Sequence, residues 1–224
     1  YINGCNMETM EIISQVDHTV LSPAATFLDV KAAIDDAIKY SAASVCIAPY
    51  FVESAVIYAK GKIKICTVVG FPHGNSTTTA KVFETKEAVE RGASEIDMVI
   101  NIGELKAGNL GFVENELRAV KAAAKGKTLK VIIETSLLTE DEKIKMCALV
   151  SKVGAQYIKT STGFSGGGAT REDILLFKAH LSAGVKIKAS GGIKTLQDAE
   201  EFIKLGCDRI GASSLIKLIK EQNP

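Results

Sequence analysis

The chain has 224 residues, of which 46% are hydrophobic and 24% charged, as is usual for a soluble globular protein that buries a large core. With 27 basic and 26 acidic side chains its formal net charge is +1, which argues against a dedicated nucleic-acid or polybasic membrane surface. The five cysteines form no Cys-x-x-Cys pair, and neither a signal peptide nor a bilayer-spanning apolar run is visible, so we expect a reduced, cytoplasmic protein without a metal site.

Short runs rich in β-branched residues alternate with amphipathic stretches along the chain. Strands are predicted at Val16–Leu21, Ser44–Tyr50, Ile63–Gly70, Glu95–Asn101, Leu129–Thr135, Gln156–Thr162, Val185–Ser190 and Asp208–Ser213. Helices are predicted at Thr26–Tyr40, Thr79–Arg91, Phe112–Lys125, Glu140–Val153, Arg171–Ala183, Leu196–Leu205 and Leu215–Glu221. This alternation implies parallel strands with right-handed crossovers. About eight such units predict an α/β fold, a single-domain (β/α)8 TIM barrel over residues 1–224 with a short lead-in at 1–14; an open doubly wound sheet is the alternative.

A weak internal repeat joins helix ends to strands in Arg91–Asp97, Val153–Lys159 and Leu205–Gly211. Each copy has a glycine where its helix should stop, which is typical of a left-handed C-cap. Five residues after that glycine come Asp97, Lys159 and Gly211. Tyr40–Cys46 is similar, with Ser41 in the place of the glycine. The repeat therefore predicts Asp97 and Lys159 at equivalent depths on different strands.

Period-2 alternation within the predicted strands indicates which side chains point into the barrel. The outer face of a barrel strand packs against helices and should be apolar. The polar parity therefore predicts five charged side chains near one axis: Asp97, Lys130, Glu134, Lys159 and Lys188. A purely structural network of ion pairs is the alternative, but buried ion pairs stabilise poorly and clustered ionisable groups commonly serve chemistry. The alternation leaves open which way Cys46 points.

Lys159 and Lys188 lie on consecutive predicted strands and could serve Schiff-base chemistry. A free lysine has a pKa near ~10.4, and only its neutral form attacks a carbonyl. Burial and a nearby cation both lower a lysine pKa, so one lysine could attack while the other tunes it. A carboxylate such as Asp97 could then move protons.

Glycine-rich segments follow the last predicted strands. Lys188–Ile193 and Ile210–Ser214 offer backbone N–H groups, hydroxyls and helix N-termini after strands seven and eight, where barrels often bind phosphate. Ser161–Asp173 carries three successive glycines and predicts either a mobile lid or a flexible surface loop. Gly70–Thr79 is a second long loop at the same mouth.

Several motifs in this order resemble the deoxyribose-phosphate aldolase family of class I aldolases. They are VGFPHG, EIDMVINIG, LKVIIET, YIKTSTGF, KASGGI and GASS, within residues 17–215. The resemblance implies a (β/α)8 barrel that reversibly cleaves 2-deoxy-D-ribose 5-phosphate to D-glyceraldehyde 3-phosphate and acetaldehyde. It also implies a role in deoxyribonucleoside catabolism, no cofactor, and a homo-oligomer, a dimer or larger.

By this resemblance Lys159 is the Schiff-base lysine, Asp97 the proton-relay carboxylate and Lys188 the second lysine. The implied substrate-binding residues are Asp17, Thr19, Lys130, Thr162, Gly163, Ser190, Gly191, Gly192, Gly211, Ser213 and Ser214. Two departures are visible. Phe164 stands where some relatives carry a lysine, and the chain ends in KEQNP without the tyrosine of some relatives' tails.

Two other functions remain open at this point. A different Schiff-base aldolase, similar to transaldolase, would use a ketose donor instead of acetaldehyde. A non-catalytic sugar-phosphate-binding barrel would bind its ligand without turnover, and Lys159→Ala would leave its affinity largely intact.

Overall fold

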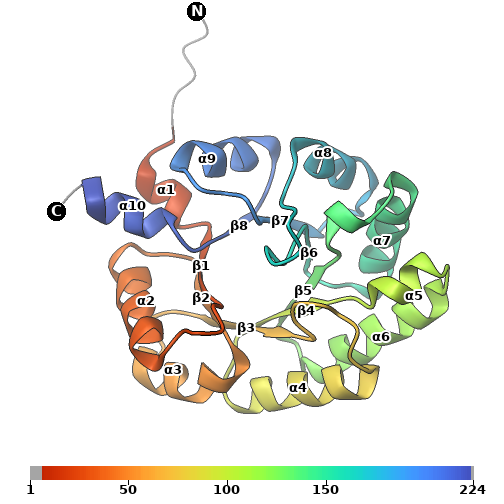
Figure 1. Cartoon of the computed structure of the whole chain (residues 1–224), viewed down its shortest axis with the longest axis horizontal. Helices are drawn as coiled ribbons and strands as arrows, with labels where there is room; N and C mark the ends of the chain where they lie inside the picture. The colour runs from red at the N-terminus through yellow and green to blue at the C-terminus, as the bar shows by residue number, and fades with distance from the viewer. Residues whose placement is uncertain (1–6, 223–224) are drawn as a thin grey trace, which may run out of the picture.

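In the computed structural model, which describes residues 7–222, eight parallel strands close into a barrel in chain order, with β8 paired back onto β1 (Figure 1). The strands are β1 Val16–Val20, β2 Ser44–Ile47, β3 Ile65–Val69, β4 Glu95–Val99, β5 Thr128–Ile132, β6 Tyr157–Lys159, β7 Lys186–Ser190 and β8 Arg209–Ala212. The predicted TIM barrel is confirmed, and the open sheet is excluded because β1 and β8 are hydrogen-bonded neighbours.

Helices surround the barrel, as Figure 1 shows. They are α1 Thr9–Ile13, α2 Phe27–Lys39, α3 Val52–Ala59, α4 Thr78–Glu90, α5 Ile102–Lys106, α6 Leu110–Ala123, α7 Glu140–Val153, α8 Arg171–His180, α9 Leu196–Leu205 and α10 Leu215–Gln222, with 3-10 turns η1 Pro49–Phe51 and η2 Thr135–Leu137. Capping boxes begin α2, α7 and α9 at Thr26, Thr139 and Thr195. The main core lies between helices and strands, where outward residues such as Val45, Ile96 and Ile158 are buried.

The repeat's glycines adopt the left-handed conformation that the pattern predicts. Gly92, Gly154 and Gly206 have φ of 99°, 72° and 109°, and Ser41, in the equivalent place, has φ of 55°. A left-handed residue after a helix satisfies its last carbonyl groups and turns the chain toward the next strand. After each of these turns the chain enters the next strand. Asp97 then lies two residues before the end of β4, and Lys159 is the last residue of β6.

Three predicted strands run three residues too far, because the chain turns earlier than its β-branched composition suggests. Tyr50 lies in η1, which Pro49 begins, and not in a strand. Glu134 has a left-handed backbone and caps η2. Thr162 lies beyond the end of β6.

Three short helices escaped prediction. One, α1, lies within the predicted lead-in 1–14, whose first six residues are outside the described range. Of the others, α3 follows β2 after the turn η1, and α5 follows β4, where the β-branched run masks the change of periodicity. The single domain over residues 1–224 stays a prediction. None of the helices described over residues 7–222 has the length and hydrophobicity needed to cross a membrane.

Candidate active site

Asp97 on β4 is the centre of a cluster of charged side chains inside the barrel. Its Oδ2 accepts hydrogen bonds from Lys159 Nζ and Lys188 Nζ, each at 2.8 Å. Its Oδ1 accepts one from Lys130 Nζ at 2.8 Å and one from Cys66 Sγ at 3.2 Å. The side chain of Asp97 is fully buried, so these donors replace the water that a free carboxylate would bind.

A second carboxylate, Asp17 on β1, balances the same cations one step away. It accepts a hydrogen bond from Lys188 Nζ and others from Arg209 at 2.6 Å and Ser44 Oγ at 2.6 Å. Beneath it Glu95 Oε2 lies 2.6 Å from Lys130 Nζ and 3.0 Å from Arg209. Opposite charges therefore alternate across the barrel, and each buried charge has partners of the other sign.

The surroundings of Asp97 and Lys188 favour the charged form of each side chain. Burial alone would raise the pKa of Asp97, but Lys130, Lys159 and Lys188 outweigh it and hold that pKa well below its usual range. Burial alone would lower the pKa of Lys188, yet Asp17 and Asp97 raise it above that of a free lysine. Lys188 is therefore an ammonium ion at any ordinary pH, next to the carboxylate that Lys159 also contacts.

A cavity of about 540 Å³ opens at the barrel mouth above this cluster. Among the described residues 7–222, Lys159 is the only charged residue that lines this cavity, and it is 4% exposed. The lining residues that the sequence predicted are Thr19, Lys159, Thr162, Gly163, Ser190, Gly191, Gly192, Gly211 and Ser213. The lining residues that it missed are Val20, Leu21, Ser22, Pro23, Phe164, Ile193 and Ala212.

The other predicted site residues lie around the cavity without lining it. Asp97, Lys188, Asp17 and Lys130 are buried in the charged cluster beneath. Ser214 directly precedes α10, whose first free N–H groups face the same end of the barrel as Ser213. The cavity thus joins one reactive amine to backbone and hydroxyl donors, which suits a carbonyl compound that carries an anionic group.

Glu134 does not join the lysine cluster as the alternation predicted. It follows the end of β5 with φ of 55°, so the strand parity no longer applies to it. Its buried carboxylate accepts hydrogen bonds from Thr162 N at 3.2 Å, from Thr162 Oγ1 at 2.5 Å and from Ser165 Oγ at 3.1 Å. Glu134 therefore anchors the segment after β6, which carries Gly163 and Phe164 along the cavity.

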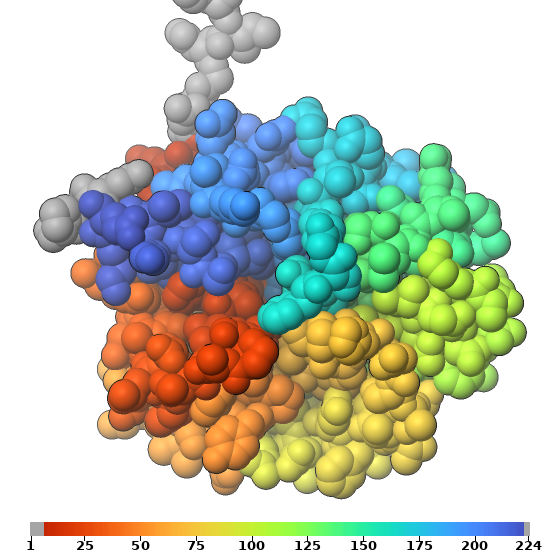
Figure 2. Space-filling model, in the orientation of Figure 1, coloured from red at the N-terminus to blue at the C-terminus, as the bar shows by residue number. Residues whose placement is uncertain are grey.

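That segment lies over the centre of the barrel in Figure 2, where it is coloured teal. Phe164 reaches across to Phe71, in the segment after β3, with ring centroids 5.3 Å apart in an edge-to-face arrangement. Gly168 packs on Gly191, and the N–H of Ala169 donates to the carbonyl oxygens of Ser190 and Gly191 at 3.1 Å. The predicted lid segment is thus tied to the loop after β7.

Sequence reasoning missed Arg209, Glu95 and Cys66 as members of the cluster. Glu95 has the parity of Asp97, and Arg209 has that of Gly211, so the same alternation could have found both. The direction of Cys46, which the alternation left open, is inward, where the side chain packs with Cys66 and Val68.

Comparison with known proteins finds similarity to aldolases in both sequence and structure. Residues 11–218 match the model of the DeoC/LacD family aldolases. A deoxyribose-phosphate aldolase from Clostridioides difficile is 52% identical over 212 residues, 95% of this chain and 97% of that protein. One from Streptococcus agalactiae is 50% identical over 216 residues, 96% of this chain and 97% of that protein. The solved structure of a deoxyribose phosphate aldolase from Aeropyrum pernix, described as a tetramer, superposes with a TM-score of 0.88 at 28% identity and covers 96% of this chain and 93% of that one.

Proposed function

The chain belongs to the DeoC/LacD family of aldolases, and from that membership we propose that it is a deoxyribose-phosphate aldolase. It cleaves 2-deoxy-D-ribose 5-phosphate reversibly to D-glyceraldehyde 3-phosphate and acetaldehyde. The observation that carries the mechanism is the contact of Lys159, in the cavity wall, with the buried Asp97 that also binds Lys188.

In this mechanism Lys159 attacks the aldehyde carbon of the open-chain sugar and loses water to form a Schiff base. The C2–C3 bond then breaks as the C3 hydroxyl gives up its proton, which releases D-glyceraldehyde 3-phosphate and leaves an enamine on Lys159. Protonation of the enamine at C2 and hydrolysis release acetaldehyde and regenerate the amine. Asp97 lies within hydrogen-bond distance of Lys159 and can pass protons to and from it.

Lys188 would keep a fixed positive charge next to the amine that attacks the substrate. Both amines donate to the same oxygen of Asp97, which puts the two groups in direct competition for one carboxylate. Lys130 occupies the other oxygen and would hold the carboxylate in place.

The phosphate of the substrate would bind among neutral donors at the other side of the cavity. Gly191 and Gly192 follow β7 with φ of 81° and 77°, and Ser213 precedes α10. Such backbone turns and helix N-termini accept anions without a cationic side chain. Ser190, Gly163, Thr162, Gly211, Thr19 and Ser214 would complete the substrate contacts.

Borohydride reduction in the presence of deoxyribose 5-phosphate tests the mechanism. We expect a stable mass increase on the peptide that carries Lys159, and loss of both the adduct and acetaldehyde release in Lys159→Ala. An active enzyme without this adduct would exclude the Schiff base, and turnover with a ketose donor but not with acetaldehyde would indicate a different aldolase.

We also propose a homo-oligomer, a dimer or larger. Support comes from apolar side chains that remain exposed on neighbouring elements: Leu28 on α2 is 74% exposed, Tyr50 on η1 82% and Ile57 on α3 70%. Helices α2 and α3 lie side by side (Figure 1) and are joined by a hydrogen bond from Tyr58 to Asp35. Light scattering on the purified protein, with Ile57→Glu as the disrupting variant, tests this assembly.

A further inference from the structure

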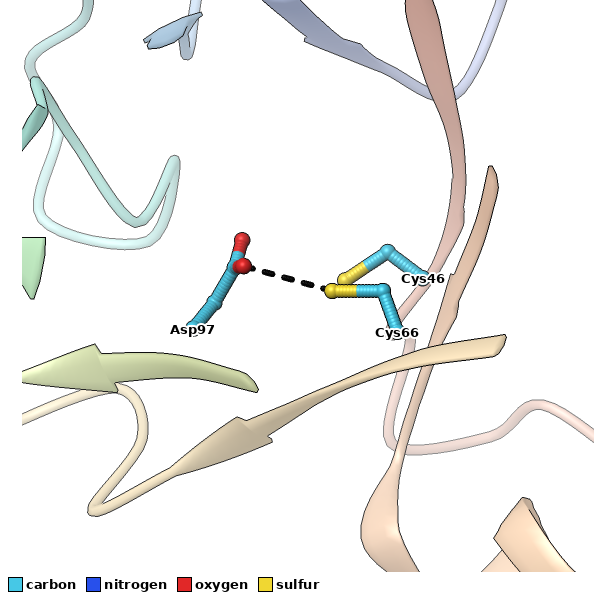
Figure 3. Close-up of side chains that lie close together, drawn as sticks. All are labelled: Cys46, Cys66 and Asp97. Atoms are coloured by element: carbon cyan, nitrogen blue, oxygen red, sulfur yellow. Dashed lines mark hydrogen bonds between the residues drawn. The ribbon is translucent and has the colours of Figure 1, made fainter. Parts of the chain in front are cut away.

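Two thiols, Cys46 on β2 and Cys66 on β3, lie inside the barrel beside Asp97 without a part in the mechanism above. Figure 3 shows both sulfur atoms facing this carboxylate from neighbouring strands. The two sulfurs and a carboxylate oxygen of Asp97 all lie within 4.8 Å of one another. Cys46 is 1% exposed and Cys66 is fully buried, and both are free thiols.

The backbone places these two residues at a separation that a disulfide can span. Cys46 and Cys66 are register partners in the parallel pair of β2 and β3, with side chains on the same inner face. Neighbouring strands are spaced about 4.8 Å apart, which lies within the Cα separation of about 4.4–6.8 Å found in disulfides. Rotation about the two side-chain bonds would therefore bring the sulfurs together without a change of register.

The two thiols differ in the way that an attacking and a resolving thiol differ. The contact with Cys66 lowers the pKa of Cys46 against the opposing effects of burial and Asp97, and Lys188 and Lys159 lower it further. Burial raises the pKa of Cys66. The register partner of Cys46 on β1 is Thr19, a residue that lines the cavity. A small oxidant that enters the barrel from the cavity would react with the thiol of lower pKa, that of Cys46.

We propose that Cys46 and Cys66 form a dithiol that hydrogen peroxide oxidises to a disulfide, and that this modification reversibly lowers the activity of the enzyme. The Cys46 thiolate attacks one oxygen of peroxide, the O–O bond breaks, and a sulfenic acid and one water are formed. Cys66 then attacks the Cys46 sulfur and displaces the second oxygen as water. The two thiols lose two electrons and two protons in total, and peroxide is reduced to two waters.

The consequence for activity follows from the contact between Cys66 and Asp97. Cys66 Sγ lies 3.2 Å from Oδ1 of Asp97 and 3.3 Å from Nζ of Lys130. Formation of the disulfide removes the thiol proton from this contact and draws the sulfur toward Cys46. Asp97 then loses one of its hydrogen bonds in a buried site, and we expect about a tenfold loss of activity. The activity readout rests on the proposed aldolase function, whereas the covalent readout does not.

The experiment uses the whole protein in a background of Cys5→Ala, Cys147→Ala and Cys207→Ala, which keeps only the two barrel thiols. Peroxide should produce a cross-linked peptide pair containing Cys46 and Cys66, two hydrogens lighter than the sum of its parts. Activity should fall about tenfold and return on addition of dithiothreitol. Cys46→Ser and Cys66→Ala in the same background should show neither the cross-link nor the reversible loss, each relative to its own untreated activity.

The unsubstituted protein gives an independent measurement if the triple variant folds poorly. Peptide mapping of that protein after peroxide should again give the pair Cys46 and Cys66. Absence of the cross-link, oxidation to sulfinic or sulfonic acid in its place, or a loss of activity that dithiothreitol does not reverse would each overturn the proposal. A cross-link that leaves activity unchanged would overturn the regulatory part. Failure of the aldolase assay before oxidation would instead count against the proposed function.

Discussion

Asp97 is a single carboxylate that satisfies three ammonium groups and a thiol from four other strands. Lys130 and Cys66 occupy Oδ1, and Lys159 and Lys188 occupy Oδ2. The two oxygens therefore have different surroundings, because Oδ1 contacts groups outside the cavity and Oδ2 contacts Lys159, which lines it. At the scale of one residue, this asymmetry would couple the ion-pair network to proton transfer in the proposed mechanism.

Replacement of Asp97 by asparagine tests this asymmetry. An amide presents one oxygen and one NH2 group, so the partners of one carboxylate oxygen would face a donor in place of an acceptor. We expect kcat to fall about 100-fold or more, while KM changes much less. Steady-state kinetics measure both, with Glu87→Gln, at an exposed position of α4, as the control that leaves kcat unchanged. A fall in kcat of less than about threefold would contradict the assigned role.

The segment between β6 and α8 packs closely against the backbone of the loop after β7. A Cβ placed on Gly168 would lie 2.4 Å from the carbonyl oxygen of Gly191, closer than any side chain could remain. Because Gly191 and Gly192 form the proposed phosphate-binding turn, a shift at Gly168 would move that turn as well. The segment over the cavity is thus coupled to the Gly191–Gly192 turn, which lines the cavity.

Gly168→Ala should therefore weaken substrate binding without removal of any reactive group. We expect KM for deoxyribose 5-phosphate to rise about tenfold, with a smaller effect on kcat. Gly111→Ala is the matched control, since a Cβ on that helical glycine meets nothing within 4 Å and should be neutral or slightly stabilising. An unchanged KM in Gly168→Ala would show that the turn moves independently of this segment.

Helices α4 and α6 are joined by a buried ion pair behind the site. Lys81 Nζ lies 2.8 Å from Glu116 Oε1 and donates to the carbonyl oxygen of Val99 at the end of β4, and both charged side chains are fully buried. Lys81→Met leaves Glu116 unpaired, so we expect the free energy of unfolding to fall by about 3–5 kcal/mol. The double variant Lys81→Met with Glu116→Leu should recover most of that loss.

Urea unfolding measures each of these variants. Lys217→Met, which removes one partner of an exposed pair on α10, should change the free energy of unfolding by less than about 1 kcal/mol. If the double variant were as unstable as Lys81→Met alone, the loss would come from packing and not from an unpaired charge.

Strand alternation gives the direction of a side chain correctly only as far as the strand itself extends. Lys130 and Glu134 share a parity in the sequence, and only Lys130 lies inside β5, so parity placed Lys130 correctly and Glu134 wrongly. Asp97, Lys159 and Lys188 lie within strands, and for these the alternation sufficed to predict a shared site. The cavity wall formed by Leu21, Pro23 and Phe164 is built from loops, whose paths no periodicity encodes.

The whole barrel separates two environments. Apolar side chains fill the space between strands and helices, while charged side chains of both signs fill much of the barrel interior. Removal of one charge inside the barrel affects several partners at once, because the groups share acceptors. The stability of the molecule should therefore depend on pH through these interior groups.

The sign of this dependence follows from the pKa directions. Despite the opposing effect of burial, neighbouring cations lower the pKa of Asp17 and that of Asp97, so both carboxylates release their protons more readily in the folded protein than in the unfolded chain. Their contribution to stability is fully present above the unfolded value of about 4 and is lost as pH falls below it. His18 adds to this in the same direction, because burial lowers its pKa and its protonation below about pH 6.5 opposes folding.

Urea unfolding between pH 8 and pH 3 tests these signs. We expect a free energy of unfolding that declines slightly below about pH 6.5 and steeply below about pH 4. His18→Gln should remove the upper, shallow part of the decline and keep the steep part, since it leaves both aspartates in place. Asp97→Asn should be less stable at neutral pH and should lose less on acidification, because one of the two groups responsible can no longer take up a proton. A free energy of unfolding that stayed constant to pH 3 would mean that these carboxylates are not held ionised by the lysines around them, and the charge assignment on which the Schiff-base mechanism depends would fail with it.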